Sequence, residues 1–212
     1  MQSDSESSSS SSSTCTSSLP WSHQQSYLIP QDIHSLYAML SKTSTNLPPL
    51  PIEIIDIIVD YAEYWVCVSH ASDHAMSGQY MNHPYLLMSK ETTSFPLFYR
   101  TKKIVFEFYA HDQGYSTDSG TWTWAECTLT SLSTVNEELL SRTELYKNKE
   151  RIGTEWQNHV FEVGEDTKIA QHFDPRKDLQ IVVFVRSWFP GWIHYVEKGR
   201  ICIYYSIRPF DL

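Results

Sequence analysis

Two short stretches of this sequence bring acidic, amide and aromatic residues close together. His111–Ser116 reads HDQGYS, and Gly120–Trp124 reads GTWTW. A carboxylate and an amide can hydrogen-bond sugar hydroxyls, while an indole face covers the C–H surface of a sugar ring. The candidate ligand-binding residues are Asp112, Gln113, Tyr115, Trp122, Trp124 and Trp192. The alternative is structural, with Asp112 and Gln113 stabilising a turn and the tryptophans filling the core.

Motifs for catalysis or metal binding are few. His70, Asp73 and His74 have a spacing similar to the HxxEH pattern of inverted zinc peptidases. The aspartate shortens the general base, the segment does not read as a helix and no third ligand is evident, so we expect no metal site. A GxSxG elbow, a papain-like cysteine context, a P-loop and a GxGxxG loop are absent. We therefore expect no cofactor and no enzymatic activity. The alternatives are a glycan-active or metal-dependent hydrolase, or a purely structural domain.

The overall charge excludes some partners. The chain has 212 residues, of which 16 are basic and 25 acidic, and its formal net charge is −9. Nucleic-acid binders carry basic surfaces that neutralise phosphates, so we expect no nucleic-acid partner. No apolar run approaches the roughly 18 residues that span a bilayer, so we expect no membrane partner.

The cysteines and the N-terminal sequence bear on the compartment. The four cysteines are scattered, at Cys15, Cys67, Cys127 and Cys202. This spacing favours buried free thiols in a reducing compartment over a disulfide framework. The N-terminal segment lacks a basic region followed by an apolar one, which a secretory signal would have. The expected location is the cytoplasm or the nucleus.

The first 66 residues of the chain are expected to hold a tail and two helices. Residues 1–18 contain eleven serines, so we expect residues 1–20 to be a disordered tail. Residues 21–66 should be helical. Apolar spacing predicts a first helix over Gln31–Leu40 and a second, opened by Pro51, that continues to Trp65.

The second predicted helix has an apolar stripe and an acidic side. The stripe consists of Ile54, Ile58, Tyr61 and Trp65, and the acidic residues are Glu53, Asp56, Asp60 and Glu63. The stripe either docks a partner or packs on the rest of the domain. The acidic residues are expected to form a solvated face.

The rest of the chain indicates β-structure. We expect residues 67–95 to be an irregular connection, with an early strand around Tyr85–Met88. Residues 135–151 are polar and are compatible with a helix or a long loop. Strand patterns occur at Ile104–Ala110, Thr121–Leu129, His159–Val163, Gln180–Trp188 and Ile201–Ile207. Strands without interleaved helices predict an antiparallel β-sandwich of jelly-roll type over residues 96–212.

The second predicted helix also resembles a known motif. Leu50–Trp65 reads LPIEIIDIIVDYAEYW and resembles the first helix of an F-box, which opens with Leu-Pro, an acidic residue and paired aliphatic residues. An F-box docks on the Skp-type adaptor of a cullin-RING ubiquitin ligase. The resemblance therefore implies a protein partner, a cullin-ligase adaptor, for the face that carries Ile54, Ile58, Tyr61 and Trp65.

The whole arrangement is similar to a family of proteins from mushroom-forming fungi that join such a helix to a β-rich domain. The segments that carry this resemblance, besides the helix, are His111–Ser116, Gly120–Trp124 and Phe189–Val196. The β-rich part also resembles galactose-binding-like jelly rolls, which include the sugar-binding domains of some F-box proteins. Together these resemblances imply a non-enzymatic binding or adaptor protein, which recognises a protein or a glycan through the loops of a β-sandwich.

Overall fold

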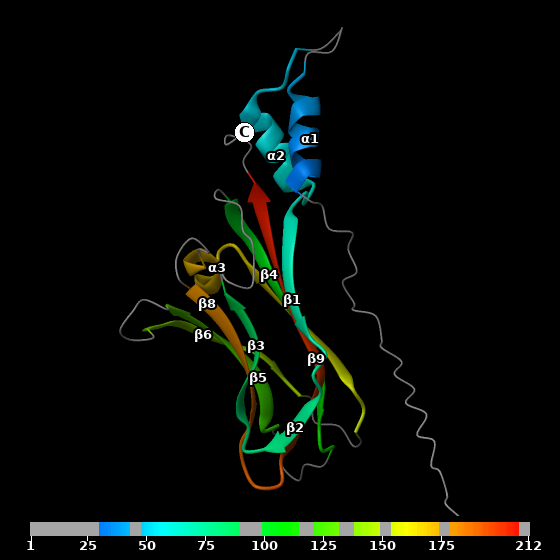
Figure 1. Ribbon diagram of the computed structural model, residues 1–212, viewed down its shortest axis with the longest axis vertical. Helices are drawn as coiled ribbons and strands as arrows, with labels where there is room; N and C mark the ends of the chain where they lie inside the picture. The colour runs from blue at the N-terminus through cyan, green and yellow to red at the C-terminus, as the bar shows by residue number, and fades with distance from the viewer. Residues whose placement is uncertain are drawn as a thin grey trace, which may run out of the picture.

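The computed structural model describes residues 30–42, 48–89, 99–114, 121–131, 138–148, 154–173 and 179–207. These residues form two antiparallel sheets that face each other, with a pair of helices at one end (Figure 1). The first sheet has the order β1-β9-β4-β7, and β2 pairs with β9 beyond β1. The second sheet has the order β3-β8-β5-β6. The predicted mainly-β antiparallel sandwich is therefore confirmed.

The strand order is that of a jelly roll. The first sheet contains β1 (Val66–Ser72), β2 (Met76–Gln79), β4 (Tyr99–Asp112), β7 (Gln157–Gly164) and β9 (Ile193–Ile207). The second contains β3 (Asn82–Ser89), β5 (Thr123–Ser131), β6 (Glu138–Lys147) and β8 (Leu179–Ser187). When β2 is taken as an extension of β1, the eight strands are shared equally between two four-stranded sheets, as in double Greek-key jelly rolls.

The core between the sheets follows the alternation of the sequence. In β5, Thr123, Ala125, Cys127 and Leu129 are fully buried, and their neighbours point outward. Ile201 and Ile203 of β9 face the same core. The cysteines Cys67, Cys127 and Cys202 are free thiols. Burial raises the pKa of Cys127 to about 12, so its thiol is protonated at neutral pH.

The helices pack on the far end of the first sheet. α1 (Pro30–Leu40) and α2 (Ile52–Tyr61) bury a small apolar cluster with the end of β9. The tyrosine hydroxyl of Tyr37 donates a hydrogen bond of 2.5 Å to Asp56, which joins the two helices. The cluster consists of Ile33, Tyr37, Ile55, Val59, Val66, Tyr205 and Ile207. None of the helices in the described ranges is long and apolar enough to cross a membrane.

α2 ends four residues earlier than the sequence predicts. The N–H of Tyr64 donates to the carbonyl of Val59 (3.0 Å), and the N–H of Glu63 donates to that of Asp60 (3.1 Å). These are the two hydrogen bonds of a Schellman motif, and Glu63 has the left-handed φ of 53° that this motif requires. The chain therefore turns at Glu63 and enters β1 at Val66.

Two further expectations are wrong. The described part of residues 67–95 is not an irregular connection, because β1, β2 and β3 occupy most of residues 66–89 and belong to the sandwich. Residues 135–151 are neither helix nor long loop over their described part, because β6 spans Glu138–Lys147. The short helix α3 (Lys168–His172) follows β7, and Thr167 caps it by accepting from the N–H of Ala170 (3.4 Å).

Candidate functional site

Exposed aromatic side chains gather at the end of the sandwich opposite the helices. They lie on the β2–β3 turn, at the start of β5 and on the loop from β8 to β9, which is the orange loop at the foot of Figure 1. Their exposed fractions range from 40% to 60%. We call Tyr80, Trp122, Trp188 and Phe189 the aromatic platform.

Backbone hydrogen bonds join the three segments of the aromatic platform. The N–H of Trp188 donates to the carbonyl of Trp122 at 3.0 Å, and the N–H of Ser187 donates to the carbonyl of Met81 at 3.0 Å. The hydroxyl of Ser187 also accepts from the N–H of Met81 at 2.8 Å. The rings of Trp122 and Phe189 lie 4.4 Å apart between centroids, at an angle of 52°. The platform is therefore carried by loops that are firmly attached to the sheets.

Two residues of the aromatic platform have a strained backbone. Tyr80 has φ 52° and Phe189 has φ 87°, which is the region that residues with a Cβ rarely adopt. Such strain persists only where the surrounding structure imposes it, and it is concentrated at functional sites. Both of these aromatic side chains are exposed.

The predicted polar ligand residues have structural roles. Asp112 is buried and its Oδ1 accepts a hydrogen bond from the N–H of Gly114 (2.8 Å). Gln113 Oε1 accepts from the N–H of Ile193 at 2.9 Å, which fixes the start of β9. For both residues these contacts match the alternative that they stabilise the local backbone instead of binding a ligand. Trp192 is half-buried beside them, and Tyr115 lies outside the described residues.

The structure separates Trp124 from the aromatic platform. Its neighbours Thr123 and Ala125 point into the core, so Trp124 lies on the outer face of the second sheet. Its indole Nε1 is 3.4 Å from Glu126 Oε2 and donates to it. Glu126 is itself buried and forms ion pairs with Arg142 (2.6 Å) and Arg186. Trp124 therefore shields an ion-pair cluster rather than joining Trp122.

Sequence reasoning missed three residues of the aromatic platform. Tyr80 lies in the region interpreted as irregular. Trp188 is predicted as the last residue of the strand Gln180–Trp188, whereas β8 ends one residue earlier, at Ser187. Phe189 belongs to the segment Phe189–Val196, in which Trp192 is the one predicted ligand residue. The available signal was the density of aromatic residues in Trp188–Trp192 (WFPGW), where a proline and a glycine interrupt the strand and so expose the flanking rings.

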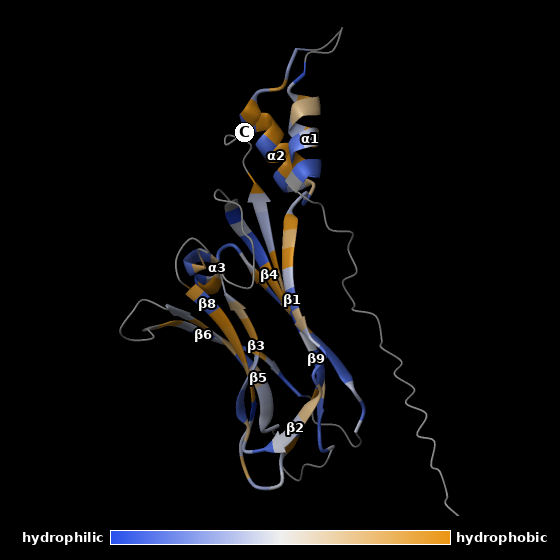
Figure 2. Cartoon of the chain, viewed as in Figure 1, coloured by the Kyte–Doolittle hydropathy of each residue, from blue (hydrophilic) through white to orange (hydrophobic). Residues whose placement is uncertain are grey.

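The predicted apolar stripe of α2 faces solvent. Ile54, Ile58 and Tyr61 are 43%, 38% and 92% exposed, while Ile55 and Val59 form the buried face. Figure 2 shows that much of this helix consists of hydrophobic residues. Of the four predicted stripe residues, Trp65 alone is half-buried, because it follows the helix and turns toward the first sheet.

A groove of about 640 Å³ lies between α2 and the end of strands β4 and β7. We call it the helix–sheet groove. Its apolar surface comes from Ile57, Tyr61 and Trp65. Its charged residues are Asp60, Lys102, Lys103, Glu162, Glu165 and Asp166.

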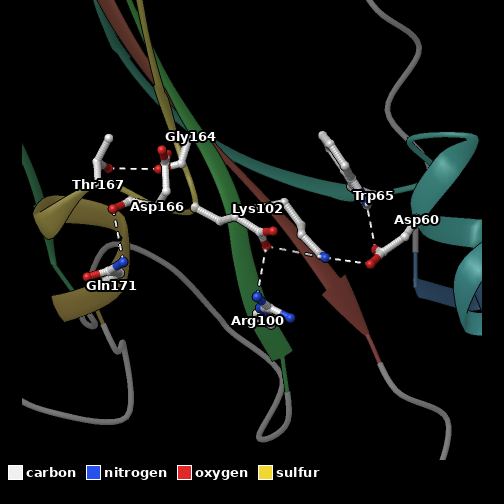
Figure 3. Close-up of polar contacts among 9 residues, drawn as sticks. Asp60, Trp65, Arg100, Lys102, Gly164, Asp166, Thr167 and Gln171 are labelled. Carbon is white, nitrogen blue, oxygen red and sulfur yellow. Dashed lines mark hydrogen bonds and ion pairs between the residues drawn. The ribbon is translucent and has the colours of Figure 1, made fainter.

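Ion pairs bridge the floor of the helix–sheet groove (Figure 3). The ammonium of Lys102 lies 2.5 Å from Asp60 Oδ2 and 3.4 Å from Glu165 Oε2. Arg100 lies 3.2 Å from the same Glu165 oxygen. The indole of Trp65 donates to Asp60 Oδ1 at 3.4 Å. Lys102 is buried and has an acidic partner on each side, so its charge is neutralised inside the groove.

The histidines whose spacing is similar to a zinc-peptidase pattern lie on an edge strand and in the segment after it. His70 lies in β1, and His74 lies in the turn that follows this strand. Among the described residues, no group of three or more histidine, cysteine, aspartate or glutamate side chains is arranged to hold a metal ion.

The fold defines a protein of the jelly-roll class. No family model matches the chain, and no curated protein matches it. Among solved structures it is similar to the VP2 subviral particle of infectious bursal disease virus, with a TM-score of 0.34 and 11% identity over 65% of this chain and 32% of that one. The T=1 particle of the same virus gives a TM-score of 0.29 and 10% identity, over 67% and 36% of the two chains. The chain thus spans about a third of those capsid chains, and likeness at this level carries no inference about its activity.

Proposed function

We propose that this protein is a non-catalytic binding module that recognises a neutral glycan on the aromatic platform. The observation that carries the proposal is the exposure of four aromatic side chains on three adjoining segments. Exposing large aromatic residues costs solvation free energy that burial would recover, so a cluster of them at a loop end indicates a surface that a ligand covers.

The residues around the aromatic platform favour a sugar over a charged ligand. The segments 78–82, 121–124 and 187–193 contain no charged residue. Gln79 and Asn82 are exposed beside Tyr80 and offer uncharged hydrogen-bonding groups. Sugar rings bind by stacking their C–H faces on aromatic rings while amides hydrogen-bond their hydroxyls, and this combination is present here.

The test is a glycan array probed with the intact protein, followed by titration calorimetry on the sugars that bind. Trp188→Ala should weaken the affinity at least about tenfold, which corresponds to about 1.4 kcal/mol. The matched control is Tyr61→Ala, which removes an even more exposed aromatic side chain from the opposite end and should leave the affinity unchanged.

Two results would contradict the glycan proposal. One is the absence of any sugar ligand for the folded protein. The other is an equal loss of affinity in the Trp188 and Tyr61 variants, which would show that binding does not depend on the platform. Circular dichroism of both variants establishes that they fold.

A second candidate function uses the other end of the molecule. The resemblance of Leu50–Trp65 to an F-box helix and the exposure of Ile54 and Ile58 favour docking of a cullin-ligase adaptor in the cytoplasm or nucleus. Ile54→Asp with Ile58→Asp should abolish binding of a purified Skp-type adaptor. Absence of binding by the folded wild-type protein would reject this function and leave the glycan proposal intact.

A further inference from the structure

The helix–sheet groove combines an apolar wall with an excess of acidic side chains. Ile57 and Tyr61 of α2 are 62% and 92% exposed along one wall. The groove is lined by four carboxylates and two lysines, and Glu63 adds another carboxylate at its rim, 3.9 Å from Lys103. The groove therefore differs from an ordinary solvated surface, which would lack the apolar wall, and from a packed core, which would lack the charged residues.

Both lysines of the groove are already engaged by the protein itself. Lys102 lies between Asp60 and Glu165. Lys103 lies 5.0 Å from the ring centroid of Tyr204 and 5.7 Å from that of Trp65, so it makes cation–π contacts with both. The positive charges are therefore held at the floor and side of the groove, where they do not repel a cationic ligand strongly.

Three of the four lining carboxylates lie on the sheet side of the groove, opposite the apolar wall, and the fourth, Asp60, belongs to α2 and is paired with Lys102. Glu162 and Gly164 belong to the end of β7, and Glu165 and Asp166 follow in the turn that leads to α3. All four are exposed. A ligand that fills the groove thus meets apolar side chains on one side and carboxylates on the other.

We propose that the helix–sheet groove binds a cationic amphipathic helix of a partner protein. Its apolar face would cover Ile57 and Tyr61, and its lysine or arginine residues would lie against Glu162 and Asp166. Amphipathic helices bind in grooves through apolar residues spaced three and four apart, and complementary charge sets their orientation and speeds association. The groove volume of about 640 Å³ accommodates several such side chains. This inference rests on neither proposed function. The aromatic platform lies at the other end of the sandwich, and the groove shares Tyr61 and Trp65, but not Ile54 and Ile58, with the stripe assigned to adaptor docking.

The test uses synthetic peptides and the full chain. The first probe is an amphipathic helix of leucine and lysine, about 18 residues or five turns long. The second is a scrambled peptide of the same composition, and the third replaces lysine with glutamate. Fluorescence anisotropy should show that the first peptide binds at least about tenfold more tightly than either of the others. Its affinity should fall with added salt.

Variants of the protein separate the groove from the general negative charge. Glu162→Lys with Asp166→Lys should weaken binding of the first peptide at least about tenfold. Asp73→Lys with Glu144→Lys makes the same change in net charge on exposed positions elsewhere and should leave binding unchanged. Tyr61→Ser tests the apolar wall, and it removes a side chain that is 92% exposed, so it should not affect folding.

Three results would overturn the proposal. Equal binding of the scrambled peptide would mean that charge alone attracts it. Equal weakening by the two charge-reversal pairs would mean that the groove is not the site. Tight binding of the peptide in which glutamate replaces lysine would mean that the groove binds apolar side chains regardless of the peptide's charge. Glycan binding is measured for every groove variant, and adaptor binding is measured for the variant at Glu162 and Asp166. These measurements distinguish each outcome from failure of the proposed functions, because those substitutions leave the aromatic platform and the apolar stripe of α2 unchanged.

Discussion

The imidazole Nε2 of His194 lies 3.1 Å from the hydroxyl oxygen of Tyr146, and the two residues come from opposite sheets. The other ring nitrogen, Nδ1, lies 3.0 Å from the carbonyl oxygen of Arg186. A carbonyl only accepts, so Nδ1 carries the proton and Nε2 accepts from the tyrosine hydroxyl. Both side chains are buried. The neutral histidine is therefore a bridge across the sandwich.

This bridge predicts acid sensitivity. Burial lowers the pKa of His194 from 6.5 to about 3. Below pH 6.5 the unfolded chain takes up a proton at this position and the folded chain does not, so the free energy of unfolding decreases as the pH falls toward 3. The expected decrease is about 1.4 kcal/mol per pH unit for a single group, or about 2 kcal/mol between pH 6.5 and pH 5. Urea unfolding at several pH values measures it.

The control for the histidine is His194→Asn, which removes the titrating group and keeps an amide that can donate to the Arg186 carbonyl. Its stability at pH 7 should be lower, but the dependence on pH between 6.5 and 4 should be flatter than in the wild type. Parallel pH profiles would assign the acid sensitivity to other groups.

The helix end at Glu63 predicts a stabilising substitution. Glycine adopts a left-handed φ without the steric cost that a Cβ imposes, so Glu63→Gly should raise the free energy of unfolding by roughly 0.5–1 kcal/mol. The ion pair lost with Lys103 is long, at 3.9 Å, and exposed, so it offsets little. Thermal unfolding checks the prediction, and Glu63→Ala is the matched comparison because it removes the same charge and keeps the Cβ. A glycine variant no more stable than the alanine variant would be the contrary result.

Close packing against Gly199 predicts a destabilising substitution. Gly199 pairs directly with Phe108, and a Cβ built at Gly199 would lie 2.7 Å from the Phe108 ring and 2.8 Å from Tyr85. Both rings belong to the core and cannot move freely, so Gly199→Ala should cost about 1–3 kcal/mol. Gly78→Ala is the comparison: its nearest neighbour is the flexible Met81 side chain at 3.0 Å, and its loss should be smaller. Similar losses at the two sites would contradict the packing argument.

The sequence predicts all four central strands, but of the edge strands it predicts only β7 near its observed bounds. The central strands β4, β5, β8 and β9 have apolar runs or clear alternation, because both neighbours and the core constrain their residues. The edge strands β1 and β6 carry polar residues that water can solvate, and their patterns resemble those of loops. Edge strand β3 was expected over four residues and spans eight.

The candidate sites depend on contacts that cannot be predicted from the spacing of residues in the sequence. Trp122 and Trp124 are two residues apart and were grouped together, yet both lie away from the core in different surroundings, one at the platform and one over Glu126. Asp112 and Gln113 have side-chain oxygens that could bind a sugar hydroxyl. In the structure these oxygens instead accept hydrogen bonds from the backbone N–H groups of Gly114 and Ile193. The helix–sheet groove joins segments about 100 residues apart in sequence, and no local pattern predicts such a meeting.

The longest strand, β9, sets a fixed separation between the two ends of the molecule. Ile193 begins it beside the aromatic loops, and Tyr204, eleven residues later, lies next to the lysine at the groove. At about 3.3 Å per residue these positions are roughly 36 Å apart. Occupants of the two surfaces would therefore not compete for space, and the strand would act as a rigid spacer that holds a sugar and a protein helix at a constant distance on one chain.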